Sequence, residues 1–370
     1  MIYFDNAATS FPKPQCVIKE VKDCLQKYCG NAGRSGHRLS LLAAEKIYRS
    51  RDSIAAHLCY PYPERVVFSQ NATYALNLAI RGLITERCHI ITSDIEHNSV
   101  IRPVHSLARE LGCRISSFDA DIDPWLAIPP LIRDDTSFII STATSNVTGQ
   151  SIDIRALSDI AKKHGLSLIL DLSQTLGHMR IDASVLHFSA LCAPGHKGLM
   201  GIQGCGFTVF SSDANPSAFI YGGSGAFSKS RDMPPELPER MEGGTLSTPA
   251  IVALMRGVEY LDKYGVATAG THLQRLTDQA SERLSSLSFV KVISANNGIV
   301  CFNVNGYSSE QVAARLDRRD IAVRGGLHCA PDAHKKLGTL ENGAVRASFS
   351  IFNKPTQVDR FYTVLKSEFG

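Results

Sequence analysis

Between residues 60 and 210, short apolar runs alternate with segments of helical periodicity, and this alternation restricts the possible fold most. Two predicted helices, 99–111 and 154–164, each follow a residue that favours the start of a helix, Asn98 and Asp153 respectively. Strands that alternate with helices predict an α/β fold, with a mainly parallel, seven-stranded sheet covered on both faces. The strand candidates are 66–68, 89–92, 114–118, 138–141, 166–170, 187–191 and 205–210.

The C-terminal third contains a second set of elements. Thr248 followed by Pro249 predicts the start of a helix over 250–264. We expect a large domain at 15–250, and a small α/β domain formed by 1–14 and 251–370. A chain of 370 residues is long enough for two such cores. The small domain would contain strands at 298–304, 321–323 and 344–349, and helices at 309–318 and from residue 355.

Charge and cysteine content exclude several classes of protein. The net charge of +4 is spread without a basic block, so nothing favours nucleic acid or an anionic membrane as a partner. No apolar run reaches the length of a membrane span, and residues 1–6 do not resemble a signal peptide. The ten cysteines are scattered without metal-ligand spacing. We therefore expect a cytoplasmic protein with reduced thiols and no metal site.

A lysine and an aspartate predict the chemistry of the site. Lys197 lies in a tight Gly-His-Lys-Gly turn between two apolar runs, where loss of water lowers the pKa of its amine. Such an amine can form a Schiff base. Asp171 ends another strand candidate, at the sheet edge where ligands bind. These are the two protein groups that pyridoxal phosphate requires. A structural lysine and a helix-capping aspartate are the alternative.

Three motifs extend this prediction: IEHN at 95–98, GHK at 195–197 and RGGLHCAP at 324–331. In their order and spacing, the chain resembles the cysteine desulfurases of the class-V aminotransferase group, within the fold-type I pyridoxal-phosphate transferases. The resemblance extends from DNAAT at 5–9 to Phe352 and Asn353. It implies a homodimeric enzyme that converts L-cysteine to L-alanine. The sulfur would pass to an acceptor protein whose identity and pathway the sequence does not give.

The resemblance also assigns residues to the cofactor. His97 would stack on the pyridoxal ring, Asn146 and Gln174 would contact its phenolic oxygen, and turn or helix-start roles are the alternatives. The phosphate would be held at a helix N-terminus. Where the family usually has hydroxyl residues, this chain has Ala72 and Pro194, so two donors to the phosphate are missing. The implied phosphate ligands are Ala72, Thr73, His196 and, from the partner subunit of the dimer, Thr245.

On the substrate side, Arg346 resembles the family arginine that binds the substrate carboxylate. Arginine suits that bidentate contact, and a structural salt bridge is the alternative. Asn146, Arg324 and His328 would also contact the substrate. Cys329 would carry the sulfur, and the positive charge of its neighbours Arg324 and His328 would favour its thiolate. The Arg-x-Gly-x-His-Cys pattern resembles the subgroup with a short, ordered cysteine loop, and a buried, inert Cys329 is the alternative. Arg34 and His37 resemble an N-terminal substrate-side loop without an assigned role.

The implied reaction uses three side chains. Lys197 removes the Cα proton, the Cys329 thiolate attacks the substrate sulfur to become a persulfide, and His97 relays protons. Selenocysteine lyase activity would use the same residues and stays open. Another class-V lyase or aminotransferase would not need Cys329. A non-catalytic sulfur-relay partner is favoured only by the incomplete phosphate site.

Overall fold

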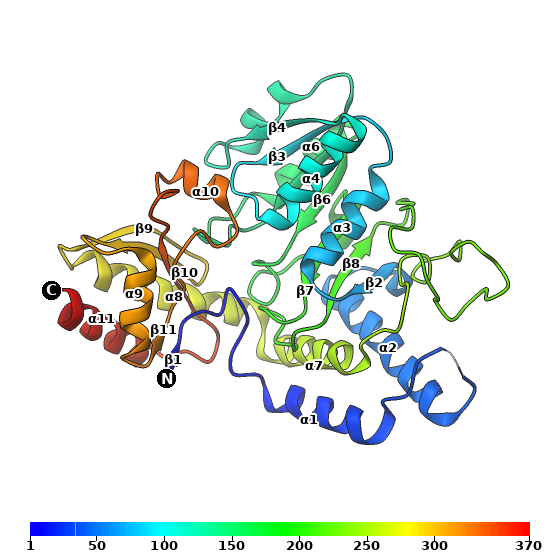
Figure 1. Ribbon diagram of the computed structural model, residues 1–370, viewed down its shortest axis with the longest axis horizontal. Helices are drawn as coiled ribbons and strands as arrows, with labels where there is room; N and C mark the ends of the chain where they lie inside the picture. Colours follow the sequence, from blue (N-terminus) through cyan, green and yellow to red (C-terminus); the bar gives the residue numbers. More distant parts are fainter. Residues whose placement is uncertain (34) are drawn as a thin grey trace.

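A seven-stranded sheet forms the centre of the molecule (Figure 1). The structure is a computed structural model that describes residues 1–33 and 35–370, so Arg34 lies outside the described residues. The strand order is β2-β8-β7-β6-β5-β3-β4, and β8 runs antiparallel to both of its neighbours. The remaining pairs are parallel, which confirms the predicted fold class. The strands are β2 Val66–Ser69, β3 His89–Ser93, β4 Arg114–Phe118, β5 Thr136–Thr142, β6 Ser167–Asp171, β7 Ala190–Pro194 and β8 Gly206–Phe210.

Helices cover both faces of this sheet. Successive residues of a strand point to opposite faces, and here both faces carry apolar side chains that must be buried. Ile139 and Leu168 belong to one apolar core, together with residues of α2, α6 and α7. Their neighbours Ile140 and Ile169 belong to a second core, with α3 and α4. The helices of the large unit are α1 Gln15–Asp23, η1 Cys24–Tyr28, α2 Arg38–His57, η2 Pro63–Arg65, α3 Ala72–Leu83, α4 Asn98–Leu111, α5 Pro124–Ala127, η3 Pro129–Leu131, α6 Ile154–His164, η4 Ala183–Val185 and α7 Thr248–Tyr264.

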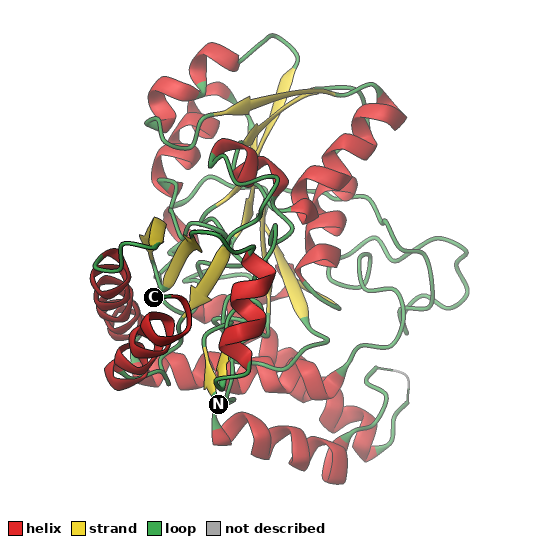
Figure 2. Cartoon of the chain, turned by 60° about the vertical axis from the view of Figure 1, so that its left-hand side comes forward, coloured by secondary structure: helices red, strands yellow, loops and turns green. Residues whose placement is uncertain are grey.

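The C-terminal third forms an antiparallel three-stranded sheet, β12-β10-β9, with its own apolar core (Figure 2). A short parallel pair joins the first residues to this part, because Ile2 lies opposite Ile321. Helix α7 crosses residue 250, so the predicted domain boundaries stay a prediction. The elements are β1 Ile2–Tyr3, α8 Val266–Ser285, β9 Val290–Asn296, β10 Ile299–Val304, α9 Ser309–Asp317, β11 Ile321–Ala322, α10 Pro331–Lys336, β12 Val345–Ser348 and α11 Pro355–Phe369.

Three predicted boundaries are corrected by the structure. The strand expected at 187–191 is β7, Ala190–Pro194, because a proline is tolerated at the end of a strand. His97, rather than Asn98, caps α4 with its side chain. Helix α7 begins at Thr248, so Ser247 takes the N-cap position predicted for Thr248. The cap of α6 by Asp153 is confirmed.

Two further findings concern membrane-spanning helices and the cysteines. Within them, no helix has both the length and the apolar character needed to cross a membrane. All ten cysteines are free thiols.

Candidate active site

A cavity of about 210 Å³ opens where β5, β6 and β7 end, and the last residues of these strands line it. The fold gathers the predicted site residues around it, although they come from segments far apart in the sequence. Thr245 is the exception, since it lines a separate cavity together with Arg51 and Glu242. The predicted residues that line the main cavity are Ala72, Thr73, His97, Asn146, Asp171, Gln174, His196, Lys197, Arg324, His328, Cys329 and Arg346.

Lys197 lies in the turn between β7 and β8, as predicted. Glycine is required beside it, because a Cβ added to Gly198 would lie 2.0 Å from the carbonyl oxygen of Leu176. The backbone of the Lys197 turn therefore packs directly against the backbone at Leu176. Burial lowers the pKa of the Lys197 amine to about 8, although the nearby Asp171 acts in the opposite direction. At pH 7 roughly a tenth of this amine is thus neutral and nucleophilic, far more than for a lysine with an ordinary pKa.

This pKa predicts how the empty protein captures pyridoxal phosphate. A protonated amine has no free electron pair, so we expect the capture rate to rise as the pH increases through about 8 and to level off above it. Stopped-flow absorbance of the apo-protein mixed with pyridoxal phosphate, between pH 6 and pH 10, measures this rate. A rate that keeps rising towards pH 10, as for an ordinary lysine, would contradict the proposed environment of Lys197.

The N-terminal segment holds the Lys197 turn in place through one carbonyl group. The carbonyl oxygen of His196 accepts hydrogen bonds from the Thr9 hydroxyl at 3.1 Å and the Lys13 amine at 2.9 Å. The amide and the hydroxyl of Ser10 also donate to it, each at 3.1 Å. Sequence reasoning missed Thr9, Ser10 and Lys13, whose partner lies more than 180 residues away.

The N-terminus of α3 is suited to hold a phosphate. Asn71 caps the helix by accepting from the amide of Tyr74. In the described part of the chain, no group accepts a hydrogen bond from the amides of Ala72 and Thr73. Both amides are therefore available to an anion. His196 lines the same cavity, and burial lowers the pKa of its imidazole to about 4, so the ring is neutral there.

His97 both caps α4 and lines the cavity, so the helix-start alternative and the cavity position are compatible. Its Nδ1 accepts from the amide of Ser99 at 3.0 Å, which leaves the proton of the neutral ring on Nε2. Burial lowers the pKa of His97 to about 4, against the opposing effect of Asp171. The Ser99 hydroxyl also lies 2.7 Å from that of Thr73. Ser99, which the sequence analysis did not single out, therefore links the ring-side and phosphate-side residues.

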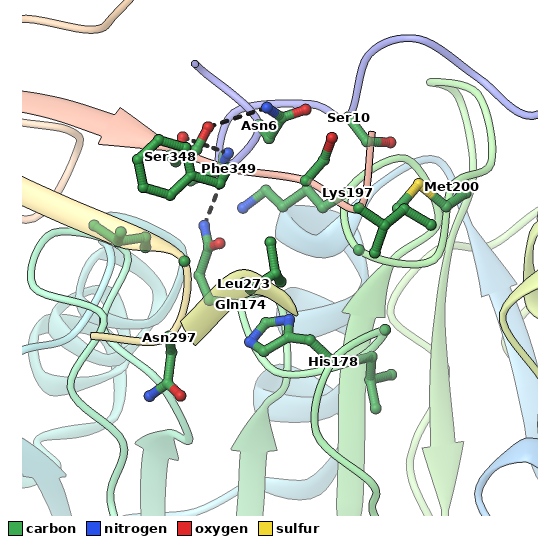
Figure 3. Close-up of a pocket in the computed structure, with 18 of the residues that line it drawn as sticks. Asn6, Ser10, Gln174, His178, Lys197, Met200, Leu273, Asn297, Ser348 and Phe349 are labelled. Atoms are coloured by element: carbon green, nitrogen blue, oxygen red, sulfur yellow. Dashed lines mark hydrogen bonds between the residues drawn. The ribbon is translucent and has the colours of Figure 1, made fainter. Parts of the chain in front are cut away.

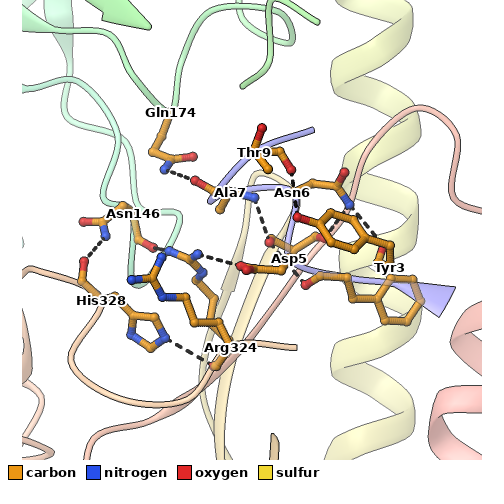
Figure 4. A network of polar contacts seen from close by, with 12 residues as sticks. Tyr3, Asp5, Asn6, Ala7, Thr9, Asn146, Gln174, Arg324 and His328 are labelled. Carbon is orange, nitrogen blue, oxygen red and sulfur yellow. Dashed lines mark hydrogen bonds and ion pairs between the residues drawn. The ribbon is translucent and has the colours of Figure 1, made fainter. Parts of the chain in front are cut away.

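Asn146 and Gln174 line the cavity with their amide groups engaged by the protein. Asn146 donates from Nδ2 to the carbonyl oxygen of His328 at 2.7 Å. Gln174 donates from Nε2 to the carbonyl oxygen of Ala7 at 2.9 Å (Figure 4). Each amide thus connects the large unit to the loops that close the cavity. Their predicted contacts with a phenolic oxygen stay a prediction.

Arg346 lies at the bottom of the cavity, and only 1% of it is exposed. Its guanidinium forms an ion pair with Asp5 at 3.0 Å and donates to the carbonyl oxygen of Asn146 at 2.7 Å. The structural salt bridge, which was the alternative prediction for Arg346, is therefore present. Among the described residues, however, its Nε has no hydrogen-bond partner. An unpartnered donor on a buried cation is what a site for a substrate carboxylate needs.

Cys329 is exposed and lines the cavity, which excludes the inert core position. Its carbonyl oxygen accepts from the amide of Asn98 at 2.7 Å. The expected positive charge of His328 is wrong, because burial lowers the pKa of this imidazole to about 2 and keeps it neutral. His37, which has no assigned role, is exposed and caps α2.

Lys197 also lines a second, small cavity, of about 50 Å³ (Figure 3). His178 lies on its wall, and within the described residues its Nε2 has no hydrogen-bond partner. Burial lowers the pKa of His178 to about 4, so the ring is neutral. Lys197 thus lines both cavities, whereas His178 lines only the second one.

These residues fit pyridoxal phosphate. Lys197 supplies an amine of lowered pKa, and Asp171 supplies a carboxylate that is only 3% exposed. The free amides at the start of α3 supply the phosphate site, which lies in the same cavity. A buried carboxylate favours a protonated pyridine nitrogen, and a helix N-terminus favours a dianion.

Comparisons with known proteins agree with this geometry. A model of the family described as Aminotransferase class-V matches residues 2–361. A probable cysteine desulfurase of Pyrococcus abyssi is 30% identical over 99% of this chain and 94% of its own length. One of Methanothermobacter thermautotrophicus is 29% identical over 96% and 92%. The apo structure of a cysteine desulfurase from Thermococcus onnurineus NA1 has a TM-score of 0.89 at 30% identity, over 100% and 94%.

Proposed function

Since the chain belongs to the class-V aminotransferase family, we propose that it is a pyridoxal-phosphate-dependent cysteine desulfurase. It converts L-cysteine to L-alanine and leaves the sulfur as a persulfide on Cys329. One observation carries the proposal: an exposed cysteine and a lysine of lowered pKa line the same cavity. A lyase or an aminotransferase without sulfur transfer has no use for this cysteine.

The residues divide the chemistry among them. Bound pyridoxal phosphate withdraws the electron pair that remains at the substrate Cα after proton loss. Asp171 keeps the pyridine nitrogen protonated, and Arg346 binds the substrate carboxylate. Lys197 accepts the Cα proton, for which a pKa of about 8 is suitable. His97, neutral and protonated on Nε2, can pass a proton to or from groups in the cavity.

Cys329 takes the sulfur in the step that defines the activity. Its thiolate attacks the sulfur of the bound cysteine, whose thiol has lost its proton, and a sulfur–sulfur bond forms. The Cβ–S bond of the substrate breaks, and its electron pair remains with Cβ, which then takes a proton. L-alanine leaves, and the persulfide passes to an acceptor protein. Cys329 supplies the nucleophile and retains the product sulfur, so it acts as a covalent catalyst.

A homodimer belongs to the same proposal. Thr245 lies outside the main cavity of its own chain, beside the buried ion pair of Arg51 and Glu242. That pair joins at 2.6 Å and fixes the segment before Thr245. A second copy of the chain could receive Thr245 at its phosphate site. The cytoplasmic location stays a prediction.

The test is the stoichiometry of the reaction. With L-cysteine and a thiol reductant, the purified holoenzyme should release alanine and sulfide in equal amounts, measured by chromatography and by methylene-blue formation. L-selenocysteine in a parallel reaction distinguishes a selenocysteine lyase, for which it would be the strongly preferred substrate. Formation of pyruvate, or alanine formation that depends on a keto acid, would contradict the proposal. No alanine at all would favour the non-catalytic relay.

A further inference from the structure

Helix α10 carries a buried histidine that none of the roles above uses. His334 is fully buried, five residues after Cys329. Its Nε2 lies 3.1 Å from Nδ1 of His328, and its Nδ1 lies 2.8 Å from the hydroxyl of Thr339. The two imidazole rings are nearly parallel, at 19°, with centroids 5.3 Å apart. His328, His334 and Thr339 thus form one buried chain of polar contacts.

A single pattern of protons satisfies this chain. The carbonyl oxygen of Arg324 can only accept, so Nε2 of His328, at 3.3 Å, carries the proton. The neutral ring then presents Nδ1 as an acceptor, and His334 donates to it from Nε2. Nδ1 of His334 in turn accepts from the Thr339 hydroxyl, whose other acceptor, the His334 carbonyl oxygen, lies farther away at 3.4 Å. Burial lowers the pKa of both rings, so both stay neutral in this pattern.

The backbone at the end of this chain needs support. His328 and Cys329 both have left-handed conformations, with φ of 51° and 58°. For residues with a Cβ, this conformation costs about 1–2 kcal/mol each. Asn146 and Asn98 hold the two carbonyl groups of the turn. The His328 side chain is held between the carbonyl oxygen of Arg324 and the ring of His334.

Helix α10 is itself attached to the large unit. Lys336, its last residue, forms ion pairs with Asp94 at 2.9 Å and Asp121 at 3.0 Å, and with Asp119. These aspartates follow β3 and β4 of the central sheet. Helix α10, which contains His334, is therefore anchored to the loops that follow two strands of the central sheet.

We propose that His334, supported by Thr339, is a positioning residue for Cys329: it holds His328 so that the thiol stays at the cavity that Lys197 lines. The inference rests on the proposed function, because the position of the thiol matters only if Cys329 receives the sulfur. It also predicts which step depends on His334. Binding of L-cysteine uses Arg346 and Lys197 and should not change, whereas sulfur transfer should slow.

Two pairs of variants test this. In His334→Phe the ring remains without its nitrogens, whereas in His334→Gln the amide can still donate to His328. Thr339→Val replaces the hydroxyl by a methyl group of similar size, whereas Thr339→Ser keeps the hydroxyl and loses the methyl group. For each holoenzyme, rapid mixing with L-cysteine gives the absorbance change on substrate binding, and quenched samples give the single-turnover rate of persulfide formation on Cys329 by mass spectrometry.

We expect His334→Phe to slow persulfide formation about tenfold, with an unchanged binding signal. His334→Gln should recover most of the rate, and Thr339→Ser should exceed Thr339→Val. Equal rates for His334→Phe and the wild type overturn the proposal, and so does a parallel loss of binding and transfer. Iodoacetamide labelling of Cys329 should be faster in His334→Phe than in His334→Gln. This contrast is informative even if the wild type forms no persulfide, which would overturn the proposed function alone.

Discussion

Replacing Cys329 by alanine should abolish sulfur transfer while the protein keeps its cofactor. The substitution removes the nucleophile from an exposed position, so the fold and the Lys197 turn are expected to persist. Turnover of L-cysteine to alanine should fall on the order of a thousandfold or more, because Cys329 is the one cysteine among the described residues that line the cavity. Alanine formation, together with the absorbance of the bound cofactor, measures both parts of the expectation.

Cys29 offers a matched control, because it is also an exposed cysteine and lies outside the cavity. Cys29→Ala should keep full activity and the persulfide on Cys329. If Cys329→Ala retained the turnover of Cys29→Ala, sulfur would leave the substrate by a route that does not use this thiol. The assignment of a desulfurase with a covalent sulfur intermediate would then be wrong.

Replacing Lys197 by alanine should remove both covalent attachment of the cofactor and proton transfer at Cα. Loss of a general base alone costs about 10²- to 10⁴-fold in rate. Borohydride treatment followed by peptide mass spectrometry should find pyridoxyl phosphate on Lys197 of the wild type and none in Lys197→Ala. Asp171 and the amides at the start of α3 are unchanged, so weaker, non-covalent binding of the cofactor should remain.

A surface lysine provides the reference for this experiment. Lys263 is exposed on α7, and Lys263→Ala should behave as the wild type. Pyridoxyl phosphate on another lysine of Lys197→Ala, together with retained activity, would contradict the role of Lys197. Retention of the label on Lys197 in Lys263→Ala confirms that the method reads the intended site.

The sequence predicted those parts of the site that depend on local pattern. Asp171 ends an apolar strand, Lys197 lies in a glycine-rich turn, and parallel strands bring both to one edge of a sheet. The predicted position of β7 is wrong by three residues, because the strand extends to Pro194 and the apolar run begins before it. Such errors leave the site intact, since the turn, and not the strand boundary, places the lysine.

Contacts between distant segments were not predictable in this way. The carbonyl oxygen of His196 accepts hydrogen bonds from Thr9, Ser10 and Lys13. No periodic pattern in the sequence indicates these contacts, and each of the three donors resembles an ordinary loop residue. His334 resembles any polar residue of a short helix until His328 is seen beside it. The charge of His328 was wrong for a related reason, because burial is a property of the whole fold.

The N-terminal segment has a consequence for biosynthesis. Ile2 pairs with Ile321, and Asp5 pairs with Arg346. These two contacts can form only when residues more than 300 positions farther along the chain have been synthesised. Contacts of such long range slow the final steps of folding. The central sheet, whose strands end at Phe210, can form on the emerging chain well before these contacts exist. During synthesis, Lys197 would thus exist well before Cys329 and Arg346 complete the pocket, and vitamin B6 would be taken up only after these residues have emerged.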